Sequence, residues 1–265
     1  MKTRRELMLE EMGLTPTWCL RAQAPKVVET GGETRSADDR SYAEDDSLEV
    51  TSQRLTPHAS RLTPSDDRRA GIMRMDWSEL KSSVAACTAC PLHAKRNKTV
   101  FGVGDENADW LFVGEGPGAE EDAQGEPFVG QAGKLLDNML AAIDLKRGHN
   151  AYIANVVKCR PPGNRNPEPG EALACEPYLH RQIELIQPKL IVALGKVAAV
   201  QLLAREATVA SLRGHVHEYR GIPMIVTYHP AYLLRSLHDK AKAWTDLCYA
   251  VETMKGLQSG QSATI

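Results

Sequence analysis

Short apolar runs alternate with helix-like stretches over the second half of the chain. The runs lie at residues 110–114, 152–157, 190–194 and 224–227. Runs of this length are typical of strands that are buried on both faces of a parallel sheet. The stretches that predict helices lie at residues 132–143, 171–186, 197–203 and 239–254. Strands that alternate with helices predict an α/β fold with three layers, α/β/α, around a central four-stranded, mainly parallel sheet.

The same pattern predicts the bounds of the folded part. A helix at residues 77–86 comes before the first run, and residues 217–220 suit a short antiparallel strand. We expect one domain over residues 71–258 and a flexible tail over 259–265. Residues 24–70 are polar without a sustained period, so burial there cannot offset an ordering entropy of roughly 1–2 kcal/mol per residue. Residues 1–70 are therefore predicted to form a mostly disordered extension.

The charge of the chain does not indicate a general nucleic-acid binder. The net charge is −2, and residues 1–70 account for it, since they hold 11 basic and 13 acidic side chains. Phosphate contacts would come from local clusters, such as residues 95–98, or from Lys158, Arg160 and Arg165. No apolar run approaches the roughly 20 residues of a membrane span, so we expect a cytoplasmic protein with no membrane contact.

Four cysteines are candidate metal ligands. Two residues separate Cys87 from Cys90, and fifteen separate Cys159 from Cys175. A structural zinc site usually has two close pairs, whereas a [4Fe–4S] cluster accepts thiolates from scattered loops. The spacing favours the cluster over zinc or free thiols, both of which stay open as alternatives.

A glycine-rich loop follows the first apolar run. Gly114, Gly116 and Gly118 allow the backbone to turn sharply and to approach a ligand closely. Three acidic residues at 120–122 follow, and then the pair Pro127 and Phe128. In an open α/β sheet, ligands bind at the carboxyl ends of the strands, where this loop would lie. By itself the loop indicates only a ligand-binding α/β protein.

Five segments in sequence order give the chain a resemblance to a known family. They are residues 87–92, 114–130, 155–162 with Cys175, 194–196 and 229–235. Together they resemble the family 4 uracil-DNA glycosylases, the iron–sulfur branch of the uracil-DNA glycosylase superfamily. The resemblance covers about residues 77–256. It implies a monofunctional enzyme that flips uracil out of single- or double-stranded DNA and hydrolyses its N-glycosidic bond, which starts base excision repair.

The resemblance also assigns cofactor and substrate contacts. It implies a [4Fe–4S] cluster on Cys87, Cys90, Cys159 and Cys175. His229 would donate a hydrogen bond to the uracil carbonyl where charge builds, and Asn155 would read the polar edge of the base. Phe128 would stack on the base, and Arg235 belongs to a segment that resembles the loop entering the duplex. Each of these residues alone would more often be a core, turn or surface residue.

The group that activates water has two candidates. Other branches carry Asp or Asn where this loop has Gly116, so a loop carboxylate must compensate. Glu121 best matches the catalytic position of the family, and Glu115 is the second candidate. A related branch that becomes covalently trapped on uracil typically has glutamine at the third position of residues 114–118 and an Arg-rich insertion. Neither is present here, which predicts turnover.

Two functions of other classes compete with this one. A non-catalytic iron–sulfur protein that binds nucleic acid or senses redox state would not need the His229–Pro230 motif or the loop carboxylates. A dinucleotide enzyme is disfavoured because the loop departs from Gly-x-Gly-x-x-Gly and no acidic residue ends the second strand. The sequence therefore favours the glycosylase.

An apolar segment precedes the polar extension. Residues 4–21 contain Leu7, Met8 and Trp18 among other apolar side chains, and such a set is typical of a segment that orders on binding. The segment resembles the N-terminal peptide of the psi subunit of the bacterial clamp loader, which docks on the chi subunit. We predict a chi-like, replication-associated partner for an otherwise monomeric protein, and the alternative is a helix that lies on the domain.

Overall fold

The computed structural model describes residues 64–260. Within this range the strands form a six-stranded sheet in the order β1-β3-β2-β4-β6-β5. Its four central strands are parallel, namely β2 (Trp110–Gly114), β3 (Ala151–Asn155), β4 (Leu190–Leu194) and β6 (Ile222–Thr227). Every residue of β2, β3 and β4 is buried, as apolar runs between two helical layers require. The predicted α/β fold with its parallel four-stranded centre is confirmed.

Two short antiparallel strands form the edges of the sheet. Strand β5 (Val216–Tyr219) pairs with β6, as expected for residues 217–220. Strand β1 (Val103–Gly104) pairs with β3 and was not predicted, because two residues cannot show an apolar run. A Cβ at Gly104 would lie 2.3 Å from the carbonyl oxygen of Ala151, so the close pairing requires glycine.

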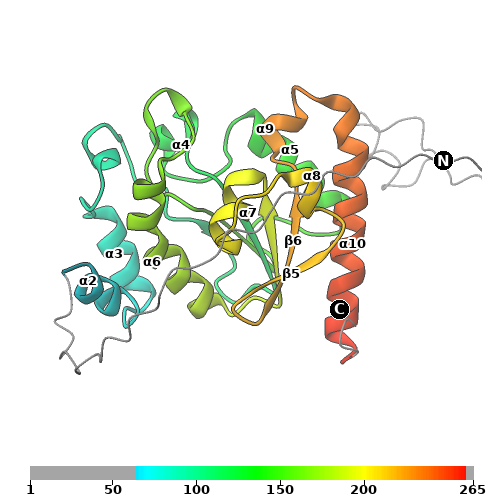
Figure 1. Ribbon diagram of the computed structural model, residues 1–265, viewed down its shortest axis with the longest axis horizontal. Coiled ribbons are helices and arrows are strands. Elements are labelled where there is room, and N and C mark those ends of the chain that lie inside the picture. Colours follow the sequence, from blue (N-terminus) through cyan, green and yellow to red (C-terminus); the bar gives the residue numbers. More distant parts are fainter. Residues whose placement is uncertain (1–63, 261–265) are drawn as a thin grey trace, which may run out of the picture.

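Long helices cover both faces of the sheet (Figure 1). One face packs against α3 (Trp77–Ala85), α6 (Pro169–Ile186) and α7 (Lys196–Leu203). The other packs against α5 (Gln131–Ala142) and α10 (Lys240–Gln258). Side chains alternate along β2, so Leu111 faces the first set of helices and Phe112 faces the second. This arrangement places the carboxyl ends of the parallel strands at one edge of the layered domain.

The folded part begins earlier than residue 71, where the sequence analysis placed its start. Helix α2 (Pro64–Ile72) precedes α3 and packs against α6. Arg69 forms an ion pair with Glu176, and Arg68 donates to the carbonyl oxygen of Ala174 at 2.9 Å. The disorder predicted for residues 64–70 was wrong, because polar contacts with α6 order a segment that has little apolar surface of its own. The predicted peptide at residues 4–21 lies outside the described residues.

Shorter helices lie in the connecting segments of the described range. They are α4 (Ala119–Gln124), α8 (Val209–Leu212), α9 (Pro230–Leu233), and the 3₁₀ turns η1 (Pro91–Ala94), η2 (Pro162–Asn164) and η3 (Leu237–Asp239). None of the helices between residues 64 and 260 has the length and apolarity that a membrane span requires.

Candidate active site

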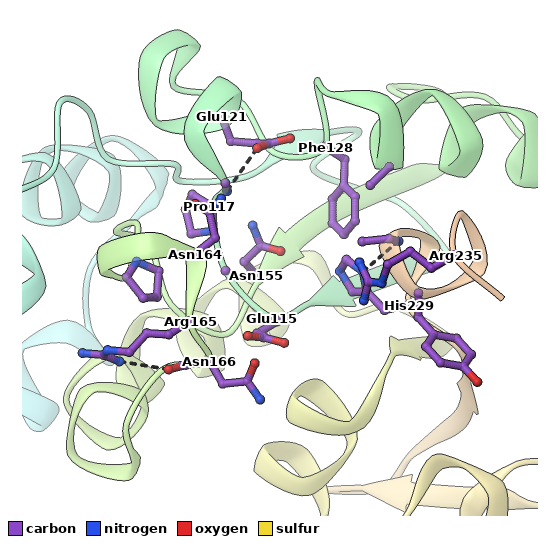
Figure 2. A pocket seen from close by; sticks show the side chains of 16 residues that line it. Glu115, Pro117, Glu121, Phe128, Asn155, Asn164, Arg165, Asn166, His229 and Arg235 are labelled. Carbon is purple, nitrogen blue, oxygen red and sulfur yellow. Dashed lines mark hydrogen bonds between the residues drawn. The ribbon is translucent and has the colours of Figure 1, made fainter.

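A cavity of about 450 Å³ lies beside the carboxyl ends of β2, β3 and β6 (Figure 2). Every residue that the sequence analysis proposed for catalysis or base contact lines it. These residues are Glu115, Gly116, Glu121, Phe128, Asn155, His229 and Arg235. They come from the carboxyl end of β3 and from the loops that follow β2 and β6, so the parallel sheet brings together residues that are more than 100 positions apart in the sequence.

Gly114, the last residue of β2, makes room for two of these side chains. In the register of the sheet, Gly114 lies opposite Asn155 at the end of β3. A Cβ at Gly114 would lie 2.5 Å from Asn155 Oδ1 and 2.5 Å from the ring of Phe128. A methyl group would overlap both atoms, so glycine is required for Asn155 and Phe128 to meet at the cavity.

The amide of Asn155 is buried but not fully hydrogen-bonded. Its side chain is 2% exposed, and Oδ1 has no hydrogen-bond partner among the described residues. A buried acceptor of this kind is unfavourable by about 1–3 kcal/mol unless a ligand donates to it. Asn155 therefore offers an unpaired acceptor to a donor that enters the cavity.

Phe128 and His229 form one wall of the cavity. Their rings stack with centroids 5.5 Å apart and an interplanar angle of 30°. Phe128 is 6% exposed and has a left-handed backbone with φ of +56°. This conformation is unfavourable for a side chain with a Cβ, so neighbouring groups must hold it.

His229 is held as a neutral ring in one tautomer. It precedes α9, and its Nδ1 accepts from the backbone N–H of Ala231 at 3.1 Å. Burial, reinforced by the positive charge of Arg235, lowers the pKa of His229 to about 4. Because Nδ1 is an acceptor, the proton of the neutral ring resides on Nε2.

The two candidate carboxylates differ in their contacts. Glu121 Oε1 accepts from the N–H groups of Val129 and Gly130, at 3.0 and 3.2 Å, and Oε2 accepts from Gly118 at 3.0 Å. Glu121 thus ties both ends of the loop together. The Glu115 carboxylate has no hydrogen bond or ion pair within residues 64–260, and burial raises its pKa. These contacts favour Glu115 as the carboxylate that is available to a substrate.

Two of the cations suggested for phosphate contact have partners within the domain. Lys158 is buried, and its Nζ donates to the Asn155 carbonyl at 2.9 Å and to Gln182 at 2.6 Å. Arg165 forms a bidentate pair with Glu171. The expectation for Lys158 was wrong, because the sequence does not reveal which cations are buried with internal partners. Arg165 lines the cavity, so its contact with phosphate stays a prediction.

A second cavity is lined by the four candidate cysteine ligands. Cys87 and Cys90 lie between α3 and η1, Cys159 follows β3, and Cys175 lies in α6. Among the described residues, no three His, Cys, Asp or Glu side chains converge on a single ion. The four thiolates of a [4Fe–4S] cluster each bind a different iron and therefore stand further apart than ligands around one ion.

Several N–H groups point at these sulfurs. Arg96 Nη1 donates to Cys159 Sγ at 3.2 Å, and the backbone N–H of Lys158 donates to Cys175 Sγ at 3.3 Å. Hydrogen bonds of this kind stabilise thiolates and are usual around iron–sulfur clusters. The donor set and its surroundings therefore fit such a group.

The sequence of this chain is similar to those of known uracil-DNA glycosylases. The family model for the uracil DNA glycosylase superfamily matches residues 101–249. A Type-4 uracil-DNA glycosylase of Archaeoglobus fulgidus is 46% identical over 164 residues, which are 59% of this chain and 82% of that protein. The Type-4 uracil-DNA glycosylase of Thermotoga maritima is 46% identical over 161 residues, covering 60% and 83%. A Type-5 uracil-DNA glycosylase of Pyrobaculum aerophilum is 32% identical over 148 residues, covering 49% and 64%.

The chain belongs to the uracil-DNA glycosylase superfamily. The prediction of the family 4 branch is confirmed, because the Type-4 proteins match more of the chain at higher identity than the Type-5 protein does. The family match includes the glycine-rich loop, Asn155 and His229, and it begins after Cys87 and Cys90. The roles of the individual residues stay predictions.

Sequence reasoning missed part of the cavity wall. Pro161, Asn164 and Asn166 line it from the loop between Cys159 and Cys175, and none of the three was assigned a role from the sequence. Tyr232, which belongs to the segment expected to enter the duplex, also lines the cavity. The richness of the loop between the two cysteines in Pro, Gly and Asn was the available signal, because these residues favour defined turns.

Proposed function

We propose that this chain excises uracil from DNA by hydrolysing the N-glycosidic bond, which leaves an abasic site and starts base excision repair. The observation that carries this proposal is the unpaired, buried Oδ1 of Asn155 beside the rings of Phe128 and His229. These groups match the three recognition features of uracil, which are its N3–H donor, its flat face and its carbonyl oxygens. Membership of the superfamily and the names of the Type-4 relatives support the proposal.

Asn155 would distinguish uracil from cytosine. Its Oδ1 would accept from N3–H of uracil, and its amide N–H₂ would donate to O4. Cytosine has an acceptor at N3 and an amino group at position 4. The acceptor Oδ1 would then face another acceptor, and the amide N–H₂ would face another donor. The ring of Phe128 would stack on a base that has been flipped out of the helix.

His229 would stabilise the leaving group. As the bond breaks, negative charge builds on the uracil, and the Nε2–H of the neutral ring would donate to O2. Arg235 adds a positive charge on the same side of the cavity. The N–H of Ala231 fixes the tautomer before the substrate arrives, so no reorganisation is needed during the reaction.

Glu115 would activate the water and stabilise the positive sugar. Its carboxylate lines the cavity without an internal partner, while the oxygens of Glu121 accept three backbone hydrogen bonds. We therefore assign base catalysis to Glu115 and loop positioning to Glu121, the reverse of the order given by the family resemblance. A carboxylate with a raised pKa and unpaired oxygens is a better base than one whose oxygens already accept three backbone hydrogen bonds.

A segment next to the cavity would enter the duplex. Tyr232, Leu234 and Leu237 are exposed by 37%, 42% and 61%, in the segment that contains Arg235. Apolar side chains inserted between base steps can replace the stacking of a flipped base.

The four cysteines Cys87, Cys90, Cys159 and Cys175 would hold a [4Fe–4S] cluster. When bound, such a group can transfer electrons or link the segments that ligate it. Hydrolysis of an N-glycosidic bond transfers no electrons, so no step of the reaction is assigned to it. Arg96 would orient this part of the chain, because it also donates to the carbonyl oxygens of Cys87 and Ala85 at 2.7 and 2.9 Å.

The partner and location proposals rest on sequence alone. The chi-like partner of residues 4–21 would be tested by pull-down of a clamp-loader chi subunit with a peptide of residues 1–24. Retention no greater than that of the Trp18→Ala peptide would contradict it. A monomeric, cytoplasmic enzyme is proposed on the same basis, and sedimentation of the full chain tests the monomer.

A direct assay tests the proposed activity. The iron-replete full chain is incubated with an oligonucleotide that contains one uracil, and hot alkali then cleaves any abasic site. A matched oligonucleotide with thymine at the same position is the control. We expect cleavage at the uracil alone. Tight binding of the uracil oligonucleotide without cleavage would instead favour a non-catalytic iron–sulfur protein.

A further inference from the structure

The backbone of Phe128 is held in place by contacts behind the cavity wall. Its φ of +56° turns the carbonyl oxygen toward the first turn of α5. A Cβ at Gly133 would lie 1.7 Å from that oxygen, so α5 must have glycine there for the turn to pack. The position of the Phe128 ring therefore depends on the groups that fix the carbonyl oxygens of residues 127 and 128.

Arg147 contacts both of these oxygens. Its Nη1 donates to the carbonyl oxygen of Pro127 at 2.7 Å, and its Nη2 donates to that of Phe128 at 2.8 Å. Nε and Nη2 also donate to Asp137 Oδ1, at 3.1 and 3.0 Å. A planar guanidinium can make this set of contacts in one orientation, whereas the ammonium of a lysine cannot reproduce its fork. Asp137, from α5, thus orients the arginine, and the arginine fixes the turn.

We propose that Arg147 is a positioning residue for base capture, acting through Phe128. The inference rests on the proposed function, because it assigns Phe128 to stacking on uracil. Arg147 lies between α5 and β3, outside the set of residues that line the cavity. Arg147 therefore does not contact a base in the cavity, and it would affect excision by holding the turn at residues 127–128.

Removal of the guanidinium would leave two carbonyl oxygens without their charged donors. Charge-assisted hydrogen bonds are roughly twice as strong as neutral ones, so the turn would lose its strongest restraint against relaxing toward negative φ. The ring of Phe128 would then leave its place beside His229 and Gly114, and a flipped uracil would lose part of its stacking surface.

A double-mutant cycle separates this role from general stability. We expect Arg147→Ala to lower kcat/KM for uracil excision about 5- to 20-fold, within the range found for residues in contact. In a Phe128→Ala background, the same change should lower it by less than about two-fold, because the group through which it acts is already missing. Arg147→Lys should recover part of the activity. Equal losses in the two backgrounds would overturn the proposal.

The control is Arg181→Ala. Arg181 has a similar side-chain exposure, 19% against 21%, and also links a carbonyl oxygen, that of Met75, to a carboxylate, that of Glu184. Arg181 is not among the residues that line the cavity, and its removal should leave kcat/KM within about two-fold. A loss as large as that of Arg147→Ala would mean that the effect is one of stability, which would also overturn the proposal.

A readout independent of activity completes the test. Amide hydrogen exchange of a peptide over residues 126–134 should be faster in Arg147→Ala than in wild type, and unchanged in Arg181→Ala. Unchanged exchange in Arg147→Ala would contradict the inference even if excision falls. If wild type releases no uracil, the proposed function fails, and the exchange result still decides whether Arg147 holds the turn.

Discussion

The neutral state of His229, whose ring is partly buried, makes stability depend on pH in a defined direction. The pKa of His229 is lowered from 6.5 to about 4 in the folded chain, first by burial and then by Arg235. Above pH 6.5 the ring is neutral in both the folded and the unfolded states. As the pH falls from 6.5 to 4, the unfolded chain binds a proton that the folded chain does not, so stability is lost in that window.

The size of the effect follows from the two pKa values. The full difference corresponds to roughly 3 kcal/mol, at about 1.4 kcal/mol per unit. At pH 5, linkage gives a loss of about 2 kcal/mol relative to pH 8. Because the ring is only half-buried at the wall of an open cavity, water screening makes these figures upper limits.

Urea unfolding at pH 8, 6 and 5 measures this contribution. We expect wild type to lose more stability than His229→Gln between pH 8 and 5, by about 1–2 kcal/mol, because glutamine does not titrate. His149→Gln, at an exposed position outside the cavity lining, is the matched control for introducing glutamine. Parallel pH profiles for wild type and His229→Gln would refute the neutral, pre-oriented ring and with it the proposed donor role of Nε2.

Four further predictions concern other parts of the molecule. Glu115→Gln should lower the single-turnover rate. Wild type should lose activity as the pH falls through the raised pKa of Glu115, and the variant should not show this pH dependence. Glu121→Gln should chiefly lower the free energy of unfolding, by about 1–3 kcal/mol, because it weakens three hydrogen bonds to backbone N–H groups of the loop. A lower melting temperature would report this loss. The reverse pattern would restore Glu121 as the base. Gly114→Ala should abolish excision, because the added methyl group would overlap Asn155 and the Phe128 ring. Gly71→Ala is the control, since a Cβ there has open space. Equal excision activity of the two variants would contradict the close contact at Gly114. Anaerobically purified wild type should absorb near about 400 nm, as thiolate-ligated iron–sulfur clusters do, and Cys159→Ala should lose iron. Colourless, active protein with stoichiometric zinc would contradict the cluster.

The sequence predicts the buried strands of the fold well. Strands β2 and β4 have the bounds expected at residues 110–114 and 190–194, because a continuous apolar run that is buried on both faces has few other conformations available. Helix α4 was not expected, since its segment is acidic and its stability comes from distant polar contacts. Asp122 accepts two hydrogen bonds from Asn97, which no local pattern reveals.

The residues of the site could be predicted only where they belong to a recognisable sequence motif. His229, Asn155 and Phe128 were found through their segments, and the parallel sheet brings them to one cavity. The contacts that decide between Glu115 and Glu121, and the contacts of Arg147, depend on which backbone groups face which side chains. That information arises only when residues far apart in the sequence are brought together by the fold.

A single-turnover measurement of free uracil decides between a glycosylase and a protein that only binds DNA. Excess iron-replete protein is mixed with an oligonucleotide that contains one uracil, and free base and abasic sites are counted for wild type and for His229→Ala. We expect equal amounts of the two products from wild type and a rate about 10²–10³ lower for His229→Ala, the usual effect of removing one donor to a developing anion. No uracil from wild type, or equal rates for the two proteins with DNA binding intact, would contradict this expectation.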